Sequence, residues 1–253
     1  MRSPVVNFCA IAAIVAGLLA FSAPAQALRL SPFSVELAPS GAGATRLFEL
    51  ENDESQPVAV QISMVRREMD VAGRETLTDA ESEFIVFPPQ IILLPQDQRG
   101  VRVQWLGDPA PKAELAYRIV VEQLPIVNAP PDELRGPKIT VLFRFEGTLY
   151  ITPRGARSDL IVERTEARQK NGAPPELAVS LWNRGNAHAI VSGVALDIAS
   201  EASGKVVRLG EERLERMAGE NVLAGQRRMF LLPWPDDLPR GPARASLVVS
   251  PPR

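Results

Sequence analysis

Apolar and polar residues alternate along most of the chain in short runs that end at Gly, Pro, Asn or Asp. Because successive side chains of a β-strand point to opposite faces, this alternation predicts half-buried strands. Seven such runs lie between Leu28 and Pro153, and six more lie within residues 159–252. Two stretches break the pattern: residues 69–83, MDVAGRETLTDAESE, predict a polar loop, and residues 209–222 could form a short helix.

Many short strands separated by turn residues are typical of immunoglobulin-like sandwiches. A chain of 253 residues suits two domains of ordinary size or one large sandwich. The alternating pattern restarts after TPRGARSD at residues 152–159. We therefore predict an all-β protein with two immunoglobulin-like β-sandwich domains, residues 28–154 and 155–253, and a cleft between them.

The first 27 residues follow a different order: Arg2, an uncharged apolar stretch from about Phe8 to Phe21, and the small-residue sequence at 25–27, Ala-Gln-Ala. This order is typical of a secretory signal peptide, cleaved here after Ala27. A membrane anchor is the weaker alternative, because a membrane-spanning helix needs roughly 20 apolar residues. We expect export to the periplasm, with no membrane insertion after cleavage.

Residues 138–153, KITVLFRFEGTLYITP, form an unusually long alternating run. The apolar residues at odd positions are Ile139, Val141, Phe143, Phe145, Leu149 and Ile151, interrupted at Gly147. As one strand the run would span about 50 Å, against roughly 17–20 Å for an ordinary strand. Its apolar face could pack into the core of its own domain, or it could be offered to another protein.

The residues of catalytic and metal chemistry are scarce. His188 is the only histidine, and in NRGNAHAIV we expect it to be a partly exposed residue between a turn and a strand. Cys9 is the only cysteine and lies in the predicted signal peptide, so sites built from His and Cys are excluded by count. Asp236 and Asp237 are too few for a calcium loop. The sequence predicts no metal site.

Other enzyme signatures are missing as well. The sequence contains neither a GxxxxGK[ST] phosphate loop nor a GxGxxG dinucleotide motif. The carboxylate pairs Glu81/Glu83 and Glu211/Glu212 are expected to be solvated charges rather than glycosidase acids. A net charge of −2 offers no basic surface for nucleic acid. We predict a protein that is not an enzyme, holds no cofactor and binds no nucleic acid.

Several segments, in this order, resemble the PapD-like family of periplasmic chaperones for pilus assembly. They are LRLSPFSVEL (28–37), FIVFPPQIILLPQDQRGVRV (84–103), AYRIVVEQLP (116–125), VSLWNRGNAHAIV (179–191) and NVLAGQRRMFLLPWP (221–235). The resemblance covers nearly all of the chain after residue 27. It implies two immunoglobulin-like domains that bind pilus or related surface-fibre subunits and pass them to an outer-membrane usher.

The resemblance also gives the long run a role. A pilus subunit lacks its last strand, and the chaperone lends a strand whose alternate side chains fill the resulting groove. Ile139, Val141, Phe143 and Phe145 would form this donor face. The subunit's own folding would drive the cycle, and the free chaperone could associate with itself through the same edge.

This chain departs from the family at the anchor for the subunit's C-terminal carboxylate. Members commonly use a basic residue on the first strand and another near the end of the donor strand, but the matching positions here are Phe33-Ser34 and Gly147-Thr148. Arg144 and Arg118 are candidate substitutes, because arginine binds carboxylates bidentately. Each could instead be a solvated strand residue, and the departure suggests a divergent branch.

A competing hypothesis is a two-domain immunoglobulin-like surface module, structural or adhesive, without chaperone activity. The alternation of apolar residues alone does not decide between the two functions, because both need stable sandwiches. The donor-strand interpretation makes the sharper demand on residues 138–146, whose apolar face must be open to a partner.

Overall fold

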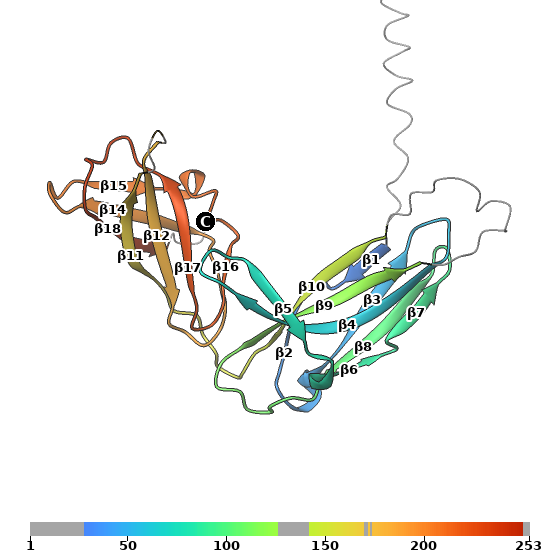
Figure 1. Ribbon diagram of the computed structural model, residues 1–253. Coiled ribbons are helices and arrows are strands. Elements are labelled where there is room, and N and C mark those ends of the chain that lie inside the picture. The colour runs from blue at the N-terminus through green and yellow to red at the C-terminus, as the bar shows by residue number, and fades with distance from the viewer. Residues whose placement is uncertain (1–27, 126–141, 170–171, 173, 250–253) are drawn as a thin grey trace, which may run out of the picture.

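The computed structural model describes residues 28–125, 142–169, 172 and 174–249. Over this range the regular elements are strands and short 3₁₀ helices, so the all-β prediction is confirmed. The strands form two bodies that meet at an angle, as in a boomerang (Figure 1). No helix within the described residues is long and apolar enough to cross a membrane.

The first body consists of two facing sheets. One sheet has the order β1-β3-β8-β6, with β1 Leu28–Ser31, β3 Thr45–Asn52, β8 Gln98–Trp105 and β6 Phe84–Phe87. The other has the order β2-β10-β9-β4-β5, with β2 Ser34–Leu37, β10 Arg144–Ile151, β9 Leu115–Leu124, β4 Val58–Met69 and β5 Glu75–Asp79. Strand β7, Gln90–Leu93, also pairs with β4 in this second sheet.

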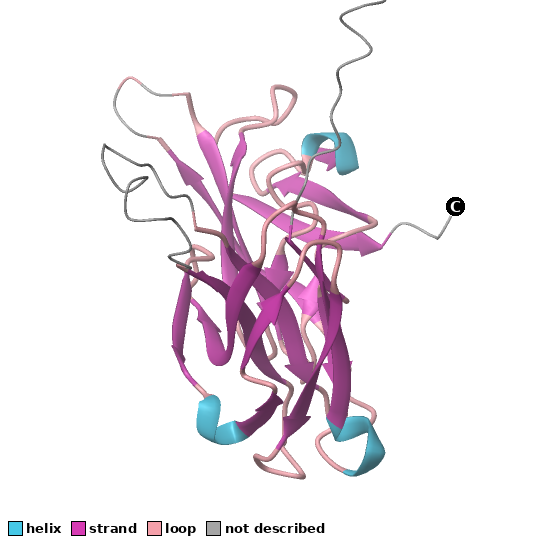
Figure 2. Ribbon diagram, turned by 90° about the vertical axis from the view of Figure 1, so that its right-hand side faces the viewer, coloured by secondary structure: helices cyan, strands magenta, loops and turns pink. Residues whose placement is uncertain are grey.

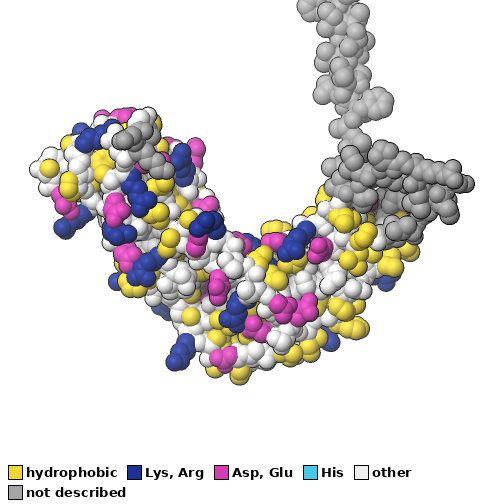
Figure 3. Space-filling view, in the orientation of Figure 1, with side chains coloured by type: hydrophobic (Ala, Val, Ile, Leu, Met, Phe, Trp, Pro, Cys, Tyr) yellow, Lys and Arg dark blue, Asp and Glu magenta, His cyan; other side chains and the backbone are white. Residues whose placement is uncertain are grey.

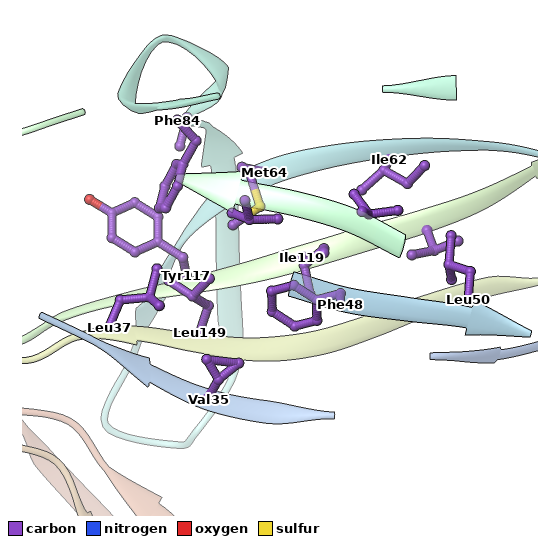
Figure 4. Packing of buried hydrophobic residues seen from close by; sticks show 14 of the residues in the cluster. Val35, Leu37, Phe48, Leu50, Ile62, Met64, Phe84, Tyr117, Ile119 and Leu149 are labelled. Carbon is purple, nitrogen blue, oxygen red and sulfur yellow. The ribbon is translucent and has the colours of Figure 1, made fainter. Parts of the chain in front are cut away.

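The alternating side chains of the two sheets meet in one hydrophobic core. Phe48 and Leu50 of the first sheet and Ile119 and Leu149 of the second are completely buried. Figure 4 shows these side chains converging from strands that are far apart in the sequence. Phe84 packs edge-on against Tyr117 with ring centres 4.9 Å apart, a favourable aromatic geometry.

Two prolines let the chain change from one sheet to the other. Strand β6 pairs with β8 in the first sheet, and after Pro88 and Pro89 the chain continues as β7, which pairs with β4 in the second. Proline cannot donate a backbone hydrogen bond, so a strand ends readily at such a pair. The segment at residues 31–34 makes a similar change, because β1 pairs with β3 whereas β2 pairs with β10.

The expected polar loop at residues 69–83 is wrong in part. Its middle forms β5, which pairs antiparallel with the far half of β4 from Val65↔Asp79 to Met69↔Glu75. The turn is built on Asp70, whose side chain accepts hydrogen bonds from the backbone of Ala72 and Arg74. Strand β5 lacks a buried alternating face, so it is held by backbone pairing that the apolar pattern does not report.

The expectation that Glu83 is merely solvated is also wrong. Its carboxylate accepts hydrogen bonds from the Tyr117 hydroxyl at 2.7 Å and from Arg66 at 2.8 Å. Burial, together with the hydrogen bond to Glu83, raises the pKa of the Tyr117 phenol. These contacts fix the end of β4 against β9.

The second body contains smaller sheets around its own core. Their orders are β11-β12-β17, β13-β16 and β15-β14-β18. The strands are β11 Leu160–Arg168, β12 Glu176–Asn183, β13 Ala189–Ile190, β14 Val194–Ser200, β15 Val206–Leu209, β16 Asn221–Val222, β17 Arg227–Pro233 and β18 Ala243–Val249. Leu177, Leu181, Leu196 and Ile198 are completely buried in this core.

The described helices are single turns of 3₁₀ type at the ends of the strands (Figure 2). They are η1 Gly41–Ala44, η2 Glu81–Glu83 and η4 Glu211–Arg213. The last lies in the segment for which a short helix was expected. It places Leu214 and Met217 in the core of the second body, which explains their spacing.

Each body contains one completely buried asparagine in an equivalent structural role. The side-chain nitrogen of Asn52 donates to the backbone carbonyls of Gln56, Leu93 and Leu94, and that of Asn183 donates to those of Ala187 and Val222. Both side chains satisfy buried backbone groups where a strand ends in a turn. A buried polar group is tolerated because it is fully hydrogen-bonded.

Replacing Asn183 with Leu should therefore lower the free energy of unfolding by about 1–3 kcal/mol or more, because buried carbonyls lose their donor. Urea denaturation of the purified protein measures this. Exposed Asn186, changed to Ser, serves as the control, although its side chain also accepts a hydrogen bond from the backbone of Arg157. Equal stability of Asn183→Leu and the wild type would contradict the structural role.

Candidate functional site

Strand β10 has a neighbour on both sides along only half of its length. Antiparallel pairing with β9 runs along the whole strand, from Arg144↔Glu122 to Ile151↔Leu115. Parallel pairing with β2 begins at Thr148, whose backbone nitrogen donates to the carbonyl of Phe33 at 2.8 Å. From Arg144 to Gly147, the outer edge has no strand partner in the described part of the chain. Such an edge can accept an added strand.

The odd positions of β10 face the core of the first body. Leu149 and Ile151 are completely buried. Gly147 lies on the same face, where a Cβ would come within 2.8 Å of Ile119 and 3.1 Å of Leu30. A side chain at position 147 would therefore crowd its neighbours, which explains the break in the apolar run.

The same apolar face continues beyond the closed part of the core. Phe145 is only partly buried against the core, and Phe143 is 46 % exposed. The two rings stack, with centres 6.3 Å apart and planes inclined by 28°. Leu142 is exposed as well. An apolar surface thus lies directly at the open edge.

Two of the four residues assigned to the donor face can be placed. Phe143 and Phe145 are described above, whereas Ile139 and Val141 lie outside the described residues. Strand β10 begins at Arg144 and ends at Ile151, so eight residues of the run at 138–153 form a strand. Residues 142 and 143 precede this strand, and residues 138–141 lie outside the described residues. Leu149 and Ile151 pack into the core of their own body, whereas the side chain of Phe143 is exposed.

The structure brings both candidate anchor residues to one hollow. The hollow has a volume of about 470 Å³ and is lined by Phe33, Arg118, Arg144, Phe145 and Glu146. It lies at the point where the open edge of β10 meets β2. Arg144 is about half exposed and its Nε donates to Glu146 at 2.9 Å.

Arg118 is held in a partly exposed network of hydrogen bonds and ion pairs on the outer face of the second sheet. Its Nε and Nη2 donate to Glu75 at 3.1 and 2.7 Å, and its Nη1 donates to the hydroxyl of Thr148. The same Glu75 carboxylate forms an ion pair with Arg67 at 2.7 Å. Burial alone would raise the pKa of the Glu75 carboxyl, but the two guanidinium groups outweigh it and the pKa is lowered.

The network carries positive charge to the place where the family anchor is expected. Residues 33–34 and 147–148, which lack basic side chains, lie side by side because Thr148 pairs with Ser34. Arg118 reaches this place from the neighbouring strand β9, through its contact with Thr148. Arg67 was missed by sequence reasoning, because it shares a site with Arg118 only through the register of β4 and β9.

A second cluster joins the two bodies. The ring of Tyr150 on β10 stacks on His188, with centres 3.9 Å apart and planes inclined by 7°. Glu114, whose side chain is only 2 % exposed, accepts from His188 Nδ1 at 2.7 Å, from its backbone nitrogen at 2.8 Å and from Thr152 at 2.9 Å. His188 therefore lies between a turn and a strand as expected, but it is a contact residue between the bodies.

The β4–β5 hairpin makes a further contact between the bodies. Its turn lies against β17, where the backbone nitrogen of Met229 donates to the carbonyl of Val71 at 2.7 Å. The side chain of Arg228 is only 6 % exposed, and it donates hydrogen bonds to Glu220 and to the sulfur of Met69. At Gly73 any Cβ would collide with this guanidinium.

A cleft remains between the bodies. A cavity of about 330 Å³ is lined by residues of the first body, including Arg66, Arg67 and Glu114, and by Leu223 and Gln226 of the second. The concave side of the boomerang in Figure 3 carries both acidic and basic side chains. Among the described residues, no group of three or more His, Cys, Asp or Glu side chains is placed to hold a metal ion.

The sequence matches the family model for the pili and flagellar-assembly chaperone, PapD N-terminal domain, over residues 31–157. This match covers half of the chain. The chain belongs to the PapD family of pilus and flagellar-assembly chaperones. This is a chaperone family rather than an enzyme class, and the match does not favour a surface module without chaperone activity.

Solved structures support the same fold. The class 5 fimbriae chaperone CfaA is 14% identical, with a TM-score of 0.54 over 90% of this chain and all of that one. A chain from a chaperone–tip adhesin complex of CFA/I fimbriae biogenesis is 14% identical, with a TM-score of 0.53 over 89% and 100%. The E. coli chaperone DraB is 18% identical, with a TM-score of 0.50 over 83% and 87%.

The curated protein sequences that were compared contain no match to this chain. The family assignment therefore depends on the family model for the first body. The solved structures support the fold of both bodies, and two of the three are covered over their full length.

The cluster around Glu114 should fix the angle between the two bodies. Replacing Glu114 with Ala removes the carboxylate that accepts three hydrogen bonds. The angle between the two bodies should then vary more, so small-angle X-ray scattering should show a broader distribution of interatomic distances. The melting temperature should fall as well, since buried donors are left unpaired. Exposed Lys112, changed to Ala in the same loop, is the control. Scattering identical to that of the wild type would show that other contacts set the angle.

Proposed function

We propose that this protein is a periplasmic chaperone that binds pilus, fimbrial or related surface-fibre subunits by donor-strand complementation and delivers them to an outer-membrane usher. The observation that carries the proposal is the half-open edge of β10, with an apolar face that runs past the core. In this proposal residues 1–27 are a signal peptide cleaved after Ala27. Residues 28–154 and 155–253 are then the two immunoglobulin-like domains.

Backbone and side chains of β10 would have separate tasks in binding. The free backbone groups of residues 144–147 pair with the edge strand of the subunit, which gives affinity with little demand on its sequence. The side chains of Phe143 and Phe145, together with Ile139 and Val141, fill the groove of the incomplete subunit. Full burial of one such side chain contributes about 1.5–3 kcal/mol before ordering costs.

The end of the bound strand would lie near the arginines. A strand added to the edge at 144–147 stops at Thr148, where the Phe33 carbonyl already accepts the backbone hydrogen bond. The hollow lined by Arg118 and Arg144 begins at this point. We assign the terminal carboxylate of the subunit to this hollow, with Arg118 as its first ligand and Arg144 as the second.

The relatives add support of a general kind. One matched chain comes from a complex of a chaperone with a tip adhesin, so that chaperone binds a fibre subunit. The fold of both bodies is shared with these structures, and the cleft of this chain could hold a subunit across both bodies. No cofactor or nucleotide is part of this proposal, and the folding of the subunit drives the cycle.

Replacing Phe143 with Asp should reduce subunit capture by about tenfold or more, because an apolar side chain is lost and a charge enters the groove. The test co-expresses the protein with a candidate fibre subunit, chosen as an exported β-rich protein, and measures the subunit that accumulates in the periplasm. Leu47→Asp is the matched control. Leu47 is 56 % exposed on β3 of the other sheet, so this variant should capture subunit normally.

The outcomes separate the two functions. Phe143 is outside the closed core, so the variant should retain its melting temperature. Normal capture by a folded Phe143→Asp protein would contradict donor-strand binding at this edge. A mature protein located on the cell exterior, with no subunit dependent on it, would favour the surface module instead.

A further inference from the structure

Glu75 contacts Arg118 although strand β4 lies between their two strands. It lies on β5, which is separated from β10 by β4 and β9. Its two oxygens accept from Nη2 and Nε of Arg118 at 2.7 and 3.1 Å, so it occupies the bidentate side of the guanidinium. The remaining Nη1 donates to Thr148. While Glu75 stays in place, a second carboxylate can approach Arg118 only at the end formed by Nη1 and Nη2, where Nη1 already donates to Thr148.

The two arginines that share Glu75 differ in burial and in surroundings. The side chain of Arg67 is 5 % exposed, and it also donates to the Tyr150 hydroxyl at 3.3 Å. Arg118 is 16 % exposed and lines the hollow beside the open edge, whereas Arg67 does not. A buried charge that loses its partner is strongly destabilised. Arg67 therefore has the greater need of Glu75, although Glu75 accepts two hydrogen bonds from Arg118.

We propose that Glu75 is a built-in carboxylate that occupies Arg118 in the free protein and gives way to the C-terminal carboxylate of the bound subunit. This inference rests on the proposed function, because it needs a strand that ends in the hollow. In the bound state Arg118 turns its bidentate side to the subunit, and Glu75 stays with Arg67. The guanidinium of Arg118 thus has an anionic partner in both states.

The exchange requires only a movement of side chains. Backbone pairing from Val65↔Asp79 to Met69↔Glu75 holds β5 on β4 in both states. An incoming end without a negative charge cannot displace Glu75, because it offers nothing in return for the lost ion pair. The preference for a free carboxylate therefore comes from Arg118, and Glu75 weakens the binding of that carboxylate because it competes for the same guanidinium.

The test uses synthetic peptides of about ten residues with apolar residues at alternate positions, a length that matches the strand and its edge. Each peptide is made with a free C-terminal carboxylate and with a C-terminal amide, and its Kd is measured by fluorescence anisotropy. Glu75→Gln should bind the carboxylate form about tenfold more tightly than the wild type. It should bind the amide form unchanged. Asp79→Asn, which makes the same charge change on β5, should resemble the wild type.

Arg118→Gln tests the other half of the exchange. This variant leaves Glu75 paired with Arg67, and it should bind the two peptide forms equally. If Arg118→Gln removes the preference for the carboxylate but Glu75→Gln changes nothing, or weakens binding, then Glu75 is only a structural partner and the proposal is overturned. If no peptide form binds to any variant, the open edge itself is not a binding site and the proposed function fails first.

Circular dichroism and melting curves establish that each variant is folded before binding is measured. Should Glu75→Gln unfold because Arg67 loses its partner, Glu75→Asp replaces it. Aspartate keeps the charge near Arg67 but is one methylene shorter, so its reach to Arg118 is reduced. Glu75→Asp should then bind the carboxylate peptide more tightly than the wild type does, and unchanged or weaker binding overturns the proposal.

Discussion

The pairing of β10 is the constraint on which the rest of the structure depends. From Thr148 onward the strand lies between β9 and β2, and its odd side chains close the first core. Before Thr148 its only strand partner among the described residues is β9, because β1 pairs in the opposite sheet and β2 begins at Ser34. One strand therefore stabilises its own domain with one half and leaves an unpaired edge with the other. An edge of this kind is a liability unless another chain covers it.

The charges near this edge follow from the cost of burying ions. Arg67 and Arg118 lie on one face of the sheet and are mostly shielded from water, so each needs an anionic partner. Glu75 serves both, and it can do so only because β5 extends the sheet beyond β4. The polar segment that links these strands is thus part of the site. It also contacts the second body through Val71 and Met229.

The sequence predicted the strands that have one buried face, because alternation records burial. Strands β3, β4, β8 and β9 belong to this class. It did not predict β5, whose side chains are not buried alternately and whose stability comes from backbone pairing. The same limit applies to the site: Arg118 could be proposed from its strand, but Arg67 and Glu75 join it only through strand register. Tyr150 likewise acquires its role from His188, which lies in the other body.

Strand β10 is contacted by His188 of the second body and by Arg67 of the first. Tyr150, two residues after Thr148, is held by His188 and by Arg67, and Arg67 is in turn held by Glu75. Ring stacking thus links His188 of the second body to Tyr150, and a hydrogen bond and ion pairs link Tyr150 through Arg67 and Glu75 to Arg118 beside the hollow. The cleft between the bodies and the open edge of β10 are therefore connected by direct contacts through Tyr150.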